Sequence, residues 1–359
     1  MKCARCGHDS TYPQRSGGVC PGCKGRFAFE PRTGDPLPDM AWKSAIDQVS
    51  SQGTVRFTAS HLHHAVARRG KRPSRSFVGL LVAGVIASAI GGGTGVAALF
   101  FFGAAMVAIG IGIAMARPTS GPKLEMERAH FQALFERWCA AHGKPKGLIA
   151  PRAAARPMSE AMRRELESYS FDRAVICDTP DTVDVLLGND FHFENNCAVL
   201  TAGGYPEHAA PTIMTMLKQN PRLEVFVLHD ATVEGCVLAH MLRNDPKWFG
   251  GSTARVFDVA LRPAQASRLV GLHWQAPRRV EPHPALTESE VAWLSKRWMS
   301  LAVITPEQLV KRLFRAMQHL PEQADKASSD TSSSGSSSSD VILWTSDAHT
   351  SDGGGDSFG

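Results

Sequence analysis

The sequence predicts an α/β fold, with a parallel sheet flanked by helices, preceded by a small zinc ribbon and a two-helix transmembrane hairpin. Three observations predict this architecture. Cysteines occur in two closely spaced pairs near the start of the chain, a long uncharged run follows, and β-branched runs then alternate with helical stretches. A chain of 359 residues is long enough for two or three domains, and its net charge of +5 is too small to identify nucleic acid as a partner by itself.

Two cysteine pairs mark the start of the chain as a metal site. The pairs are Cys3-x-x-Cys6 and Cys20-x-x-Cys23, each closely followed by glycine. A two-residue gap lets both thiolates of a pair face one ion, and four thiolates complete tetrahedral zinc without leaving an open catalytic position. Residues 1–30 are therefore predicted to be a zinc ribbon in which the zinc is structural. Two disulfides are the alternative, but they conflict with the reducing compartment predicted below.

Residues 40–75 are predicted to be a small soluble helical segment, and residues 77–116 a transmembrane helical hairpin. The second range contains no charged side chain, and a bilayer core needs about 20 apolar residues per helix, so two crossings fit. A turn is expected at residues 91–95, where four of the five residues are glycine. Arginine and lysine flank both ends of the run, so both termini are expected in the cytoplasm, as in a bacterial inner-membrane protein, with the membrane as a partner. A hairpin buried inside a large soluble core is the alternative.

Two polar regions flank the main body. Residues 122–168 are predicted to form a helical linker region, and residues 322–359 a disordered tail rich in Ser, Asp and Gly. The basic residues of the linker region fit either nucleic acid or the head groups of anionic lipids.

The main body, residues 170–320, alternates strands and helices, which is typical of a parallel sheet with helices on its faces. Sites in such sheets form at the carboxyl ends of the strands, where Asp178 closes the first predicted strand and Asp230 follows the third. One or two further helices are expected between residues 286 and 318. The predicted strands are residues 173–178, 197–201, 223–229 and 254–261, and the predicted helices are residues 181–187, 208–218 and 234–243.

Residues 172–243 resemble the Toprim domain of the A subunits of type IIB DNA topoisomerases and their meiotic recombination relatives. In that family a glutamate closes the first strand, a Gly-x-Gly-Tyr-Pro-Asp-like turn follows the second, and Asp-x-Asp followed by glycine closes the third. The counterparts here are Asp178, then Thr-Ala-Gly-Gly-Tyr-Pro-Glu at residues 201–207, then Asp-Ala-Thr-Val-Glu-Gly at residues 230–235. The resemblance implies a Toprim-like sheet.

The resemblance also implies magnesium, held by carboxylates and clamping phosphate oxygens during strand cleavage or transfer. The candidate ligands and catalytic residues are Asp178, Asp230 and Glu234. However, Thr232 replaces the second aspartate of the third-strand motif, and Asp178 is shorter than the family's glutamate. Because Mg²⁺ prefers several charged oxygen ligands, these departures favour an inactive site with a binding or scaffold role toward nucleic acid or protein.

Two other interpretations of the acids stay open. One is a magnesium-dependent phosphoryl-transfer enzyme or nuclease that uses all three carboxylates. The other is that Asp178 and Asp230 only cap the helices that follow them, with Pro180 early in the first of those helices. The sequence identifies no small-molecule substrate.

A second resemblance lies before the uncharged run. Residues 58–64, Thr-Ala-Ser-His-Leu-His-His, resemble the Thr-x-x-x-Leu-Tyr-Tyr helix that carries the nucleophilic tyrosine in those topoisomerases. Both aromatic hydroxyls are replaced by histidine, and residues 40–70 contain no tyrosine, so a tyrosyl phosphodiester cannot form there. The alternative is an ordinary amphipathic helix on which His61, His63 and His64 are polar surface.

Overall fold

The structure is a computed structural model, and the elements below belong to one compact unit, residues 1–69 with 124–359; residues 70–123 form a second unit. The described residues are 1–15, 17–69, 86, 101, 105, 126–150, 171–207, 210–269 and 273–329.

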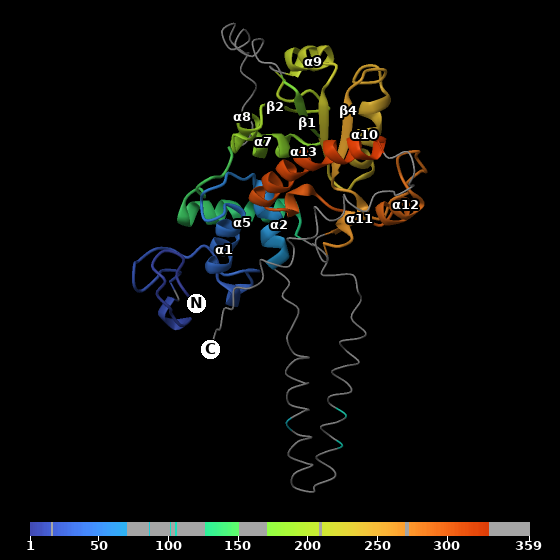
Figure 1. The fold of residues 1–359 in the computed structure, drawn as a ribbon. Helices are drawn as coiled ribbons and strands as arrows, with labels where there is room; N and C mark the ends of the chain where they lie inside the picture. The colour runs from blue at the N-terminus through green and yellow to red at the C-terminus, as the bar shows by residue number, and fades with distance from the viewer. Residues whose placement is uncertain are drawn as a thin grey trace. The chain divides into compact units, whose positions relative to one another are not determined.

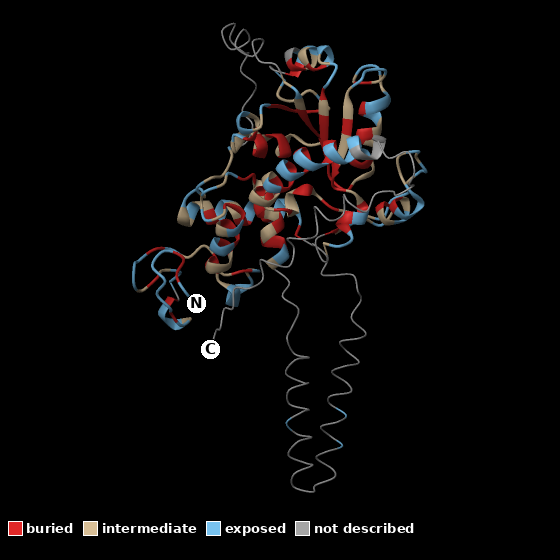
Figure 2. Cartoon of the chain, in the orientation of Figure 1, coloured by how far each residue is buried: buried red, intermediate tan, exposed pale blue. Residues whose placement is uncertain are grey.

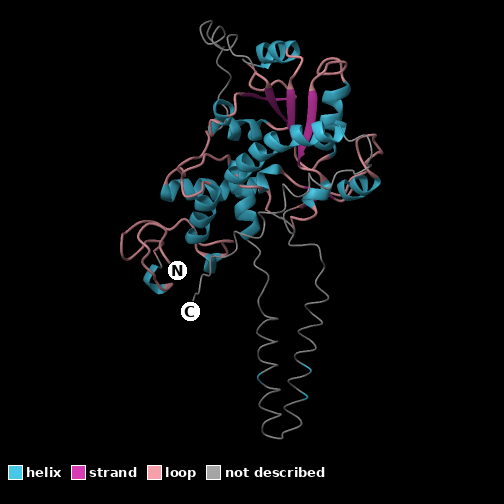
Figure 3. Ribbon diagram, in the orientation of Figure 1, coloured by secondary structure: helices cyan, strands magenta, loops and turns pink. Residues whose placement is uncertain are grey.

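A four-stranded parallel sheet forms the centre of the main body (Figures 1 and 3). Its strands pair in the order β2-β1-β3-β4, so the first and third strands of the chain are neighbours. β1, β2 and β3 are almost wholly buried, as expected for apolar strands covered on both faces. The predicted α/β class is therefore confirmed. The strands are β1 (Arg173–Cys177), β2 (Cys197–Thr201), β3 (Glu224–Leu228) and β4 (Arg255–Ala260).

Helices cover both faces of this sheet and enclose two cores (Figure 2). Successive residues of a strand point to opposite faces, so Val175 belongs to one core and Ile176 to the other. The helices α7, α8 and α13 close the first core, and α9 and α10 close the second. The helices of the body are α7 (Pro180–Gly188), α8 (Phe191–Glu194), α9 (Ala210–Gln219), α10 (Val233–Asn244), α11 (Pro263–Ala266), α12 (Glu288–Leu294) and α13 (Pro306–Ser329).

A short antiparallel pair, β5 (Trp274–Gln275) and β6 (Arg297–Trp298), and a 3₁₀ turn, η3 (Leu301–Val303), lie in the sequence between β4 and α13. One or two helices were expected between residues 286 and 318, and two are observed, α12 and α13, of which α13 continues to Ser329. Trp298, which was expected on a helix, lies instead in β6.

The amino-terminal part packs around a third core of stacked aromatic rings. The ring of Trp42 is fully buried, and its centroid lies 5.1 Å from that of Phe29, 5.9 Å from Phe131 and 6.0 Å from Trp138. These rings join the cysteine-bearing segment to two helices, α1 and α5. The elements are η1 (Pro13–Arg15), η2 (Pro31–Thr33), α1 (Asp39–Val49), α2 (Ala59–Arg69) and α5 (Arg128–His142).

The structure corrects the predicted transmembrane hairpin. Within the described ranges, no helix is both long and apolar enough to cross a bilayer. The assignment as a multi-pass membrane protein with two cytoplasmic ends is therefore not supported. Of residues 77–116, all but Ile86, Phe101 and Ala105 lie outside the described residues. The assignment rested on an uncharged run with a glycine-rich turn and basic flanks, features that membrane hairpins share but that do not by themselves establish one.

Two other predictions also fall partly outside the described residues. Residues 322–329 of the tail that was predicted to be disordered are helical, because they form the end of α13, and residues 330–359 are not described. Residues 122–125 and 151–168 of the predicted linker region are not described either.

Candidate functional site

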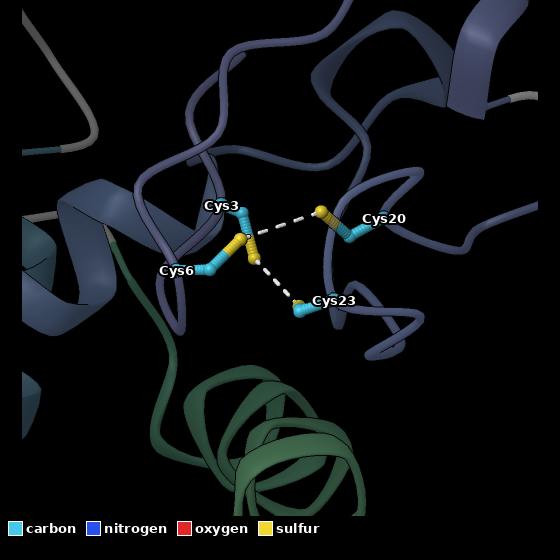
Figure 4. A group of neighbouring side chains, drawn as sticks. All are labelled: Cys3, Cys6, Cys20 and Cys23. Carbon is cyan, nitrogen blue, oxygen red and sulfur yellow. Dashed lines mark hydrogen bonds between the residues drawn. The ribbon is translucent and has the colours of Figure 1, made fainter.

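Two hairpin turns bring the four amino-terminal cysteines together (Figure 4). In the first turn the Gly7 N–H donates to the Cys3 carbonyl at 3.0 Å, and in the second the Lys24 N–H donates to the Cys20 carbonyl at 2.9 Å. Gly7 has φ of +73°, a conformation that glycine adopts without strain.

The cysteine side chains lie close enough to share one ion. All four Sγ atoms lie within 4.8 Å of one another, and the Sγ atoms of Cys3 and Cys23 are 3.7 Å apart. A disulfide needs an S–S distance of about 2 Å, and the four thiols are free, so the alternative of two disulfides is wrong. The cluster can hold a metal ion such as zinc.

A buried carboxylate fixes this cysteine segment to the helices. Asp39, at the start of α1, is fully buried, and its two oxygens accept the N–H groups of Phe29 at 2.8 Å and Ala28 at 3.0 Å. Asp39 Oδ2, which accepts the Ala28 N–H, also lies 2.6 Å from Nε2 of His142 at the end of α5. The cysteine segment is therefore held against α1 and α5.

The two predicted aspartates meet at the carboxyl edge of the sheet because β1 and β3 are neighbours. The Asp230 N–H donates to Asp178 Oδ2 at 2.7 Å, and Asp230 Oδ1 accepts the Leu301 N–H at 2.7 Å and the Ser300 hydroxyl at 3.3 Å. Asp178 Oδ1 is buried and has no hydrogen-bond partner within the described part of the chain. Burial raises the pKa of both carboxyls, and together with the nearby Asp178 charge it raises that of Asp230 to about 7.

Neither aspartate caps the helix that follows it, so the capping interpretation is wrong. The N-cap residues are Thr179 for α7 and Thr232 for α10, and the Thr232 hydroxyl accepts the Gly235 N–H at 3.0 Å. Pro180 does lie in the first turn of α7, as predicted.

The third candidate acid lies elsewhere. The side chain of Glu234 is 75% exposed and forms an ion pair with Arg278 at 3.4 Å. Among the described residues, the four cysteines are the only group of three or more His, Cys, Asp or Glu whose ligand atoms all lie within 4.8 Å of one another. The structure therefore pairs Asp178 with Asp230 without gathering all three acids at ligand distance.

Glycine is required where the third-strand motif turns into α10. A Cβ atom placed on Gly235 would lie 2.4 Å from the Asp230 carbonyl oxygen and 3.1 Å from Asp178 Oδ2. No side chain fits there without displacing the acid pair. This close approach explains the glycine that ends the Asp-Ala-Thr-Val-Glu-Gly motif.

A cavity of about 400 Å³ opens at the same edge, between the body and α2. The Ser60 hydroxyl on α2 donates to Asp181 Oδ2 on α7 at 2.5 Å. The Ala231 N–H donates to the Met299 carbonyl at 2.8 Å and holds the segment after β6 against the edge. The lining residues are Ser60, His61, His63, His64, Met126, Glu127, Arg128, Thr179, Asp181, Thr182, Asp230, Trp274, Trp298, Ser300 and Ala302.

The histidines of α2 line this cavity, so their interpretation as polar surface is wrong. His61 is 3% and His64 is 7% exposed. His61 Nδ1 lies 2.9 Å from the Thr58 hydroxyl, and His63 Nε2 donates to the Met126 carbonyl at 2.8 Å. Within the described residues, His61 Nε2 and His64 Nδ1 are buried without a hydrogen-bond partner. Burial lowers the pKa to about 4 for His61 and about 3 for His64, so both are neutral at pH 7.

Aromatic rings form one wall of the cavity. The Trp274 ring centroid lies 5.5 Å from that of His63, 5.8 Å from His64 and 6.0 Å from Trp298, against which it stacks. Trp274 Nε1 is also buried without a partner among the described residues. Sequence reasoning did not identify either tryptophan as a site residue, because two-residue strands carry no periodic signal.

Comparisons with known proteins identify no relative: no family model, no curated protein and no solved structure matches this chain. The resemblance to Toprim domains therefore stays a prediction.

Proposed function

We propose that this protein binds nucleic acid without cleaving it, through a zinc ribbon and a Toprim-like body. One observation carries the proposal. The two segments that resemble parts of type IIB topoisomerases are more than 100 residues apart in the sequence, yet both line one cavity, His61, His63 and His64 from one side and Asp230 from the other.

The chemistry of that cavity supports binding rather than cleavage. The helix that would carry a nucleophilic tyrosine carries histidines. Thr232, in the place of the second aspartate, caps α10, and Asp230 Oδ1 is occupied by the Leu301 N–H. Of the groups that cleavage requires, the tyrosine and the second aspartate are thus replaced, and Asp230 helps to hold the structure.

The cysteine cluster supports a structural zinc. Four thiolates complete a tetrahedral shell and leave no position for a substrate, and metal binding contributes folding energy to a segment too small to build its own core. We assign the metal as zinc because four sulfur ligands favour it over harder ions.

Fluorescence anisotropy with a labelled single strand and a labelled duplex tests the proposal on the full, zinc-loaded chain. We expect saturable binding that weakens as salt rises from 50 to 200 mM, because phosphate contacts release counterions. We expect no shortened strand on a denaturing gel with Mg²⁺ or Mn²⁺. Absence of binding at 50 mM salt would refute the proposal. Magnesium-dependent cleavage would instead favour the alternative function, a magnesium-dependent nuclease.

A matched pair of arginines locates the contact surface. Arg128 is exposed and lines the cavity, whereas Arg222 is exposed just before β3, at the amino edge of the sheet. Arg128→Ala should weaken binding to all sequences and reduce by about 1 the slope of the logarithm of the binding constant against the logarithm of the salt concentration. Arg222→Ala should leave both unchanged, and equal effects of the two variants would count against the cavity as the binding surface.

The alternative is a magnesium-dependent phosphoryl-transfer enzyme or nuclease. One observation favours it. Asp178 Oδ1 is buried beside Asp230 without a hydrogen-bond partner among the described residues, and such an oxygen can serve as a ligand for a cation. In that case Mg²⁺ should raise the melting temperature, because a ligand that binds only the folded state stabilises it. Asp178→Asn should remove this response. We expect no Mg²⁺-dependent shift in the parent protein.

A further inference from the structure

We infer that the cavity between α2 and the carboxyl edge of the sheet accepts one unstacked nucleobase of a single strand. The inference rests on the proposed nucleic-acid function and names what enters this site. The cavity volume of about 400 Å³ lies within the range of about 300–1,000 Å³ typical of small-molecule sites.

The aromatic wall supplies the surface for a base to stack on. Trp274 stacks on Trp298 and contacts the imidazoles of His63 and His64, and all four rings line the cavity. Proteins that bind single strands commonly stack bases on such rings, whereas a paired base has its faces covered by its neighbours. The wall therefore favours an unpaired base over a duplex.

Three residues that line the cavity carry buried polar atoms without a hydrogen-bond partner among the described residues. Buried polar atoms are normally hydrogen-bonded, and each exception calls for an explanation. Three such atoms belong to lining residues, His61 Nε2, His64 Nδ1 and Trp274 Nε1, and the two histidines are more than nine-tenths buried. A heterocycle offers both ring acceptors and ring or amine donors to these atoms.

The charge of the lining selects a base over a phosphate. The acids Glu127 and Asp181, together with Asp230, whose raised pKa of about 7 leaves it partly ionised, line the cavity against one arginine, Arg128. The buried histidines add no positive charge at pH 7. A bare phosphate would be repelled, whereas the amine of adenine or cytosine can donate to a carboxylate. Arg128, which is exposed, then lies where the backbone of the strand can reach it.

Oligonucleotides with and without bases test the inference on the full chain. The probes are short single strands of oligo(dA) and oligo(dC), their RNA counterparts, oligo(dT), and an abasic strand of the same length and charge. We expect oligo(dA) or oligo(dC) to bind roughly tenfold or more tightly than the abasic strand, with oligo(dT) between them because thymine lacks the exocyclic amine.

Trp274→Ala should abolish the difference between the base-containing and abasic strands. Trp248→Ala changes a partly buried tryptophan that packs against the core closed by α9 and α10. This variant should preserve the difference. If circular dichroism shows that Trp274→Ala is unfolded, Trp274→Leu fills more of the volume without a π face and should give the same loss.

The outcomes separate the two claims. Equal binding of abasic and base-containing strands would overturn the inference and leave nucleic-acid binding in place. A preference for bases that survives in the folded Trp274 variant would also overturn the inference. Failure of every strand to bind would overturn the proposed function, and the inference with it.

Discussion

Lowering the pH from 7 to 5 should cost about 2 kcal/mol of folding free energy through His64 alone. His64 is 7% exposed, and burial is the main cause that lowers its pKa to about 3, with His63, His61 and Arg128 acting in the same direction. A histidine in an unfolded chain titrates near 6.5. Below that pH the unfolded state therefore binds a proton that the folded state does not, so stability falls as pH falls. The interval from pH 6.5 to pH 5 is about 1.5 pH units, and each pH unit costs about 1.4 kcal/mol of folding free energy for one proton.

Other groups in the cavity also titrate, so the test compares a variant with its parent. His61 acts in the same direction as His64, because its pKa is lowered to about 4. Asp230 acts in the opposite direction, because its pKa is raised to about 7 and its protonation stabilises the fold as pH falls. A difference between two chains that share these groups cancels their contributions.

His64→Phe is the variant, since phenylalanine keeps a buried ring and His64 Nδ1 has no hydrogen bond to lose. Urea denaturation at pH 7 and pH 5 gives four unfolding free energies by linear extrapolation. The loss between the two pH values should be about 2 kcal/mol smaller in His64→Phe than in the parent. His319→Gln, at an exposed histidine of α13, is the control and should match the parent. An unchanged loss in His64→Phe would show that His64 is protonated in the folded state and would refute the reasoning.

Two further predictions concern the metal and the acid pair. Elemental analysis should find one zinc per chain, lost in Cys20→Ser and kept in Cys139→Ser, whose thiol lies outside the cluster; a folded chain without metal would contradict this. Gly235→Ala should destabilise the protein by about 1–3 kcal/mol, because its Cβ would lie 2.4 Å from the Asp230 carbonyl. Gly203→Ala, whose nearest contact would be 3.7 Å away, should change stability by no more than about 0.5 kcal/mol, and equal losses would show that the motif glycine is not constrained by packing.

The sheet was predictable because its signals are local. Each strand is a short apolar run between turns, and the run from Arg173 to Cys177 was recognisable without any knowledge of its neighbours. The rule that sites lie at the carboxyl ends of parallel strands then placed Asp178 and Asp230 at the same edge. The cysteine cluster was predictable for the same reason, since its ligands occur as local pairs.

The cavity was not predictable, because it depends on contacts between distant segments. Nothing near Ser60 in the sequence indicates that its hydroxyl will meet Asp181, 121 residues away. The pattern of α2 fits a surface helix as well as one buried beside a sheet, so His61 and His64 were placed on the surface. The hairpin failed differently, since its support was the uncharged run of residues 77–116, its glycine-rich turn and its basic flanks, all of which are features of composition.

Asp230 connects the acid pair to the cavity, and this connection gives the carboxylate a structural role that does not depend on cleavage. Its backbone N–H donates to Asp178, while its Oδ1 accepts from Ser300 and Leu301, which lie two and three residues after Trp298 of β6. The same carboxylate therefore helps to hold the segment that carries Trp298, which stacks on Trp274 in the cavity wall. Replacing Asp230 would disturb a metal site and a base-binding wall alike. Asp178, whose Oδ1 has no partner among the described residues and which does not line the cavity, is the position where a substitution distinguishes the two functions.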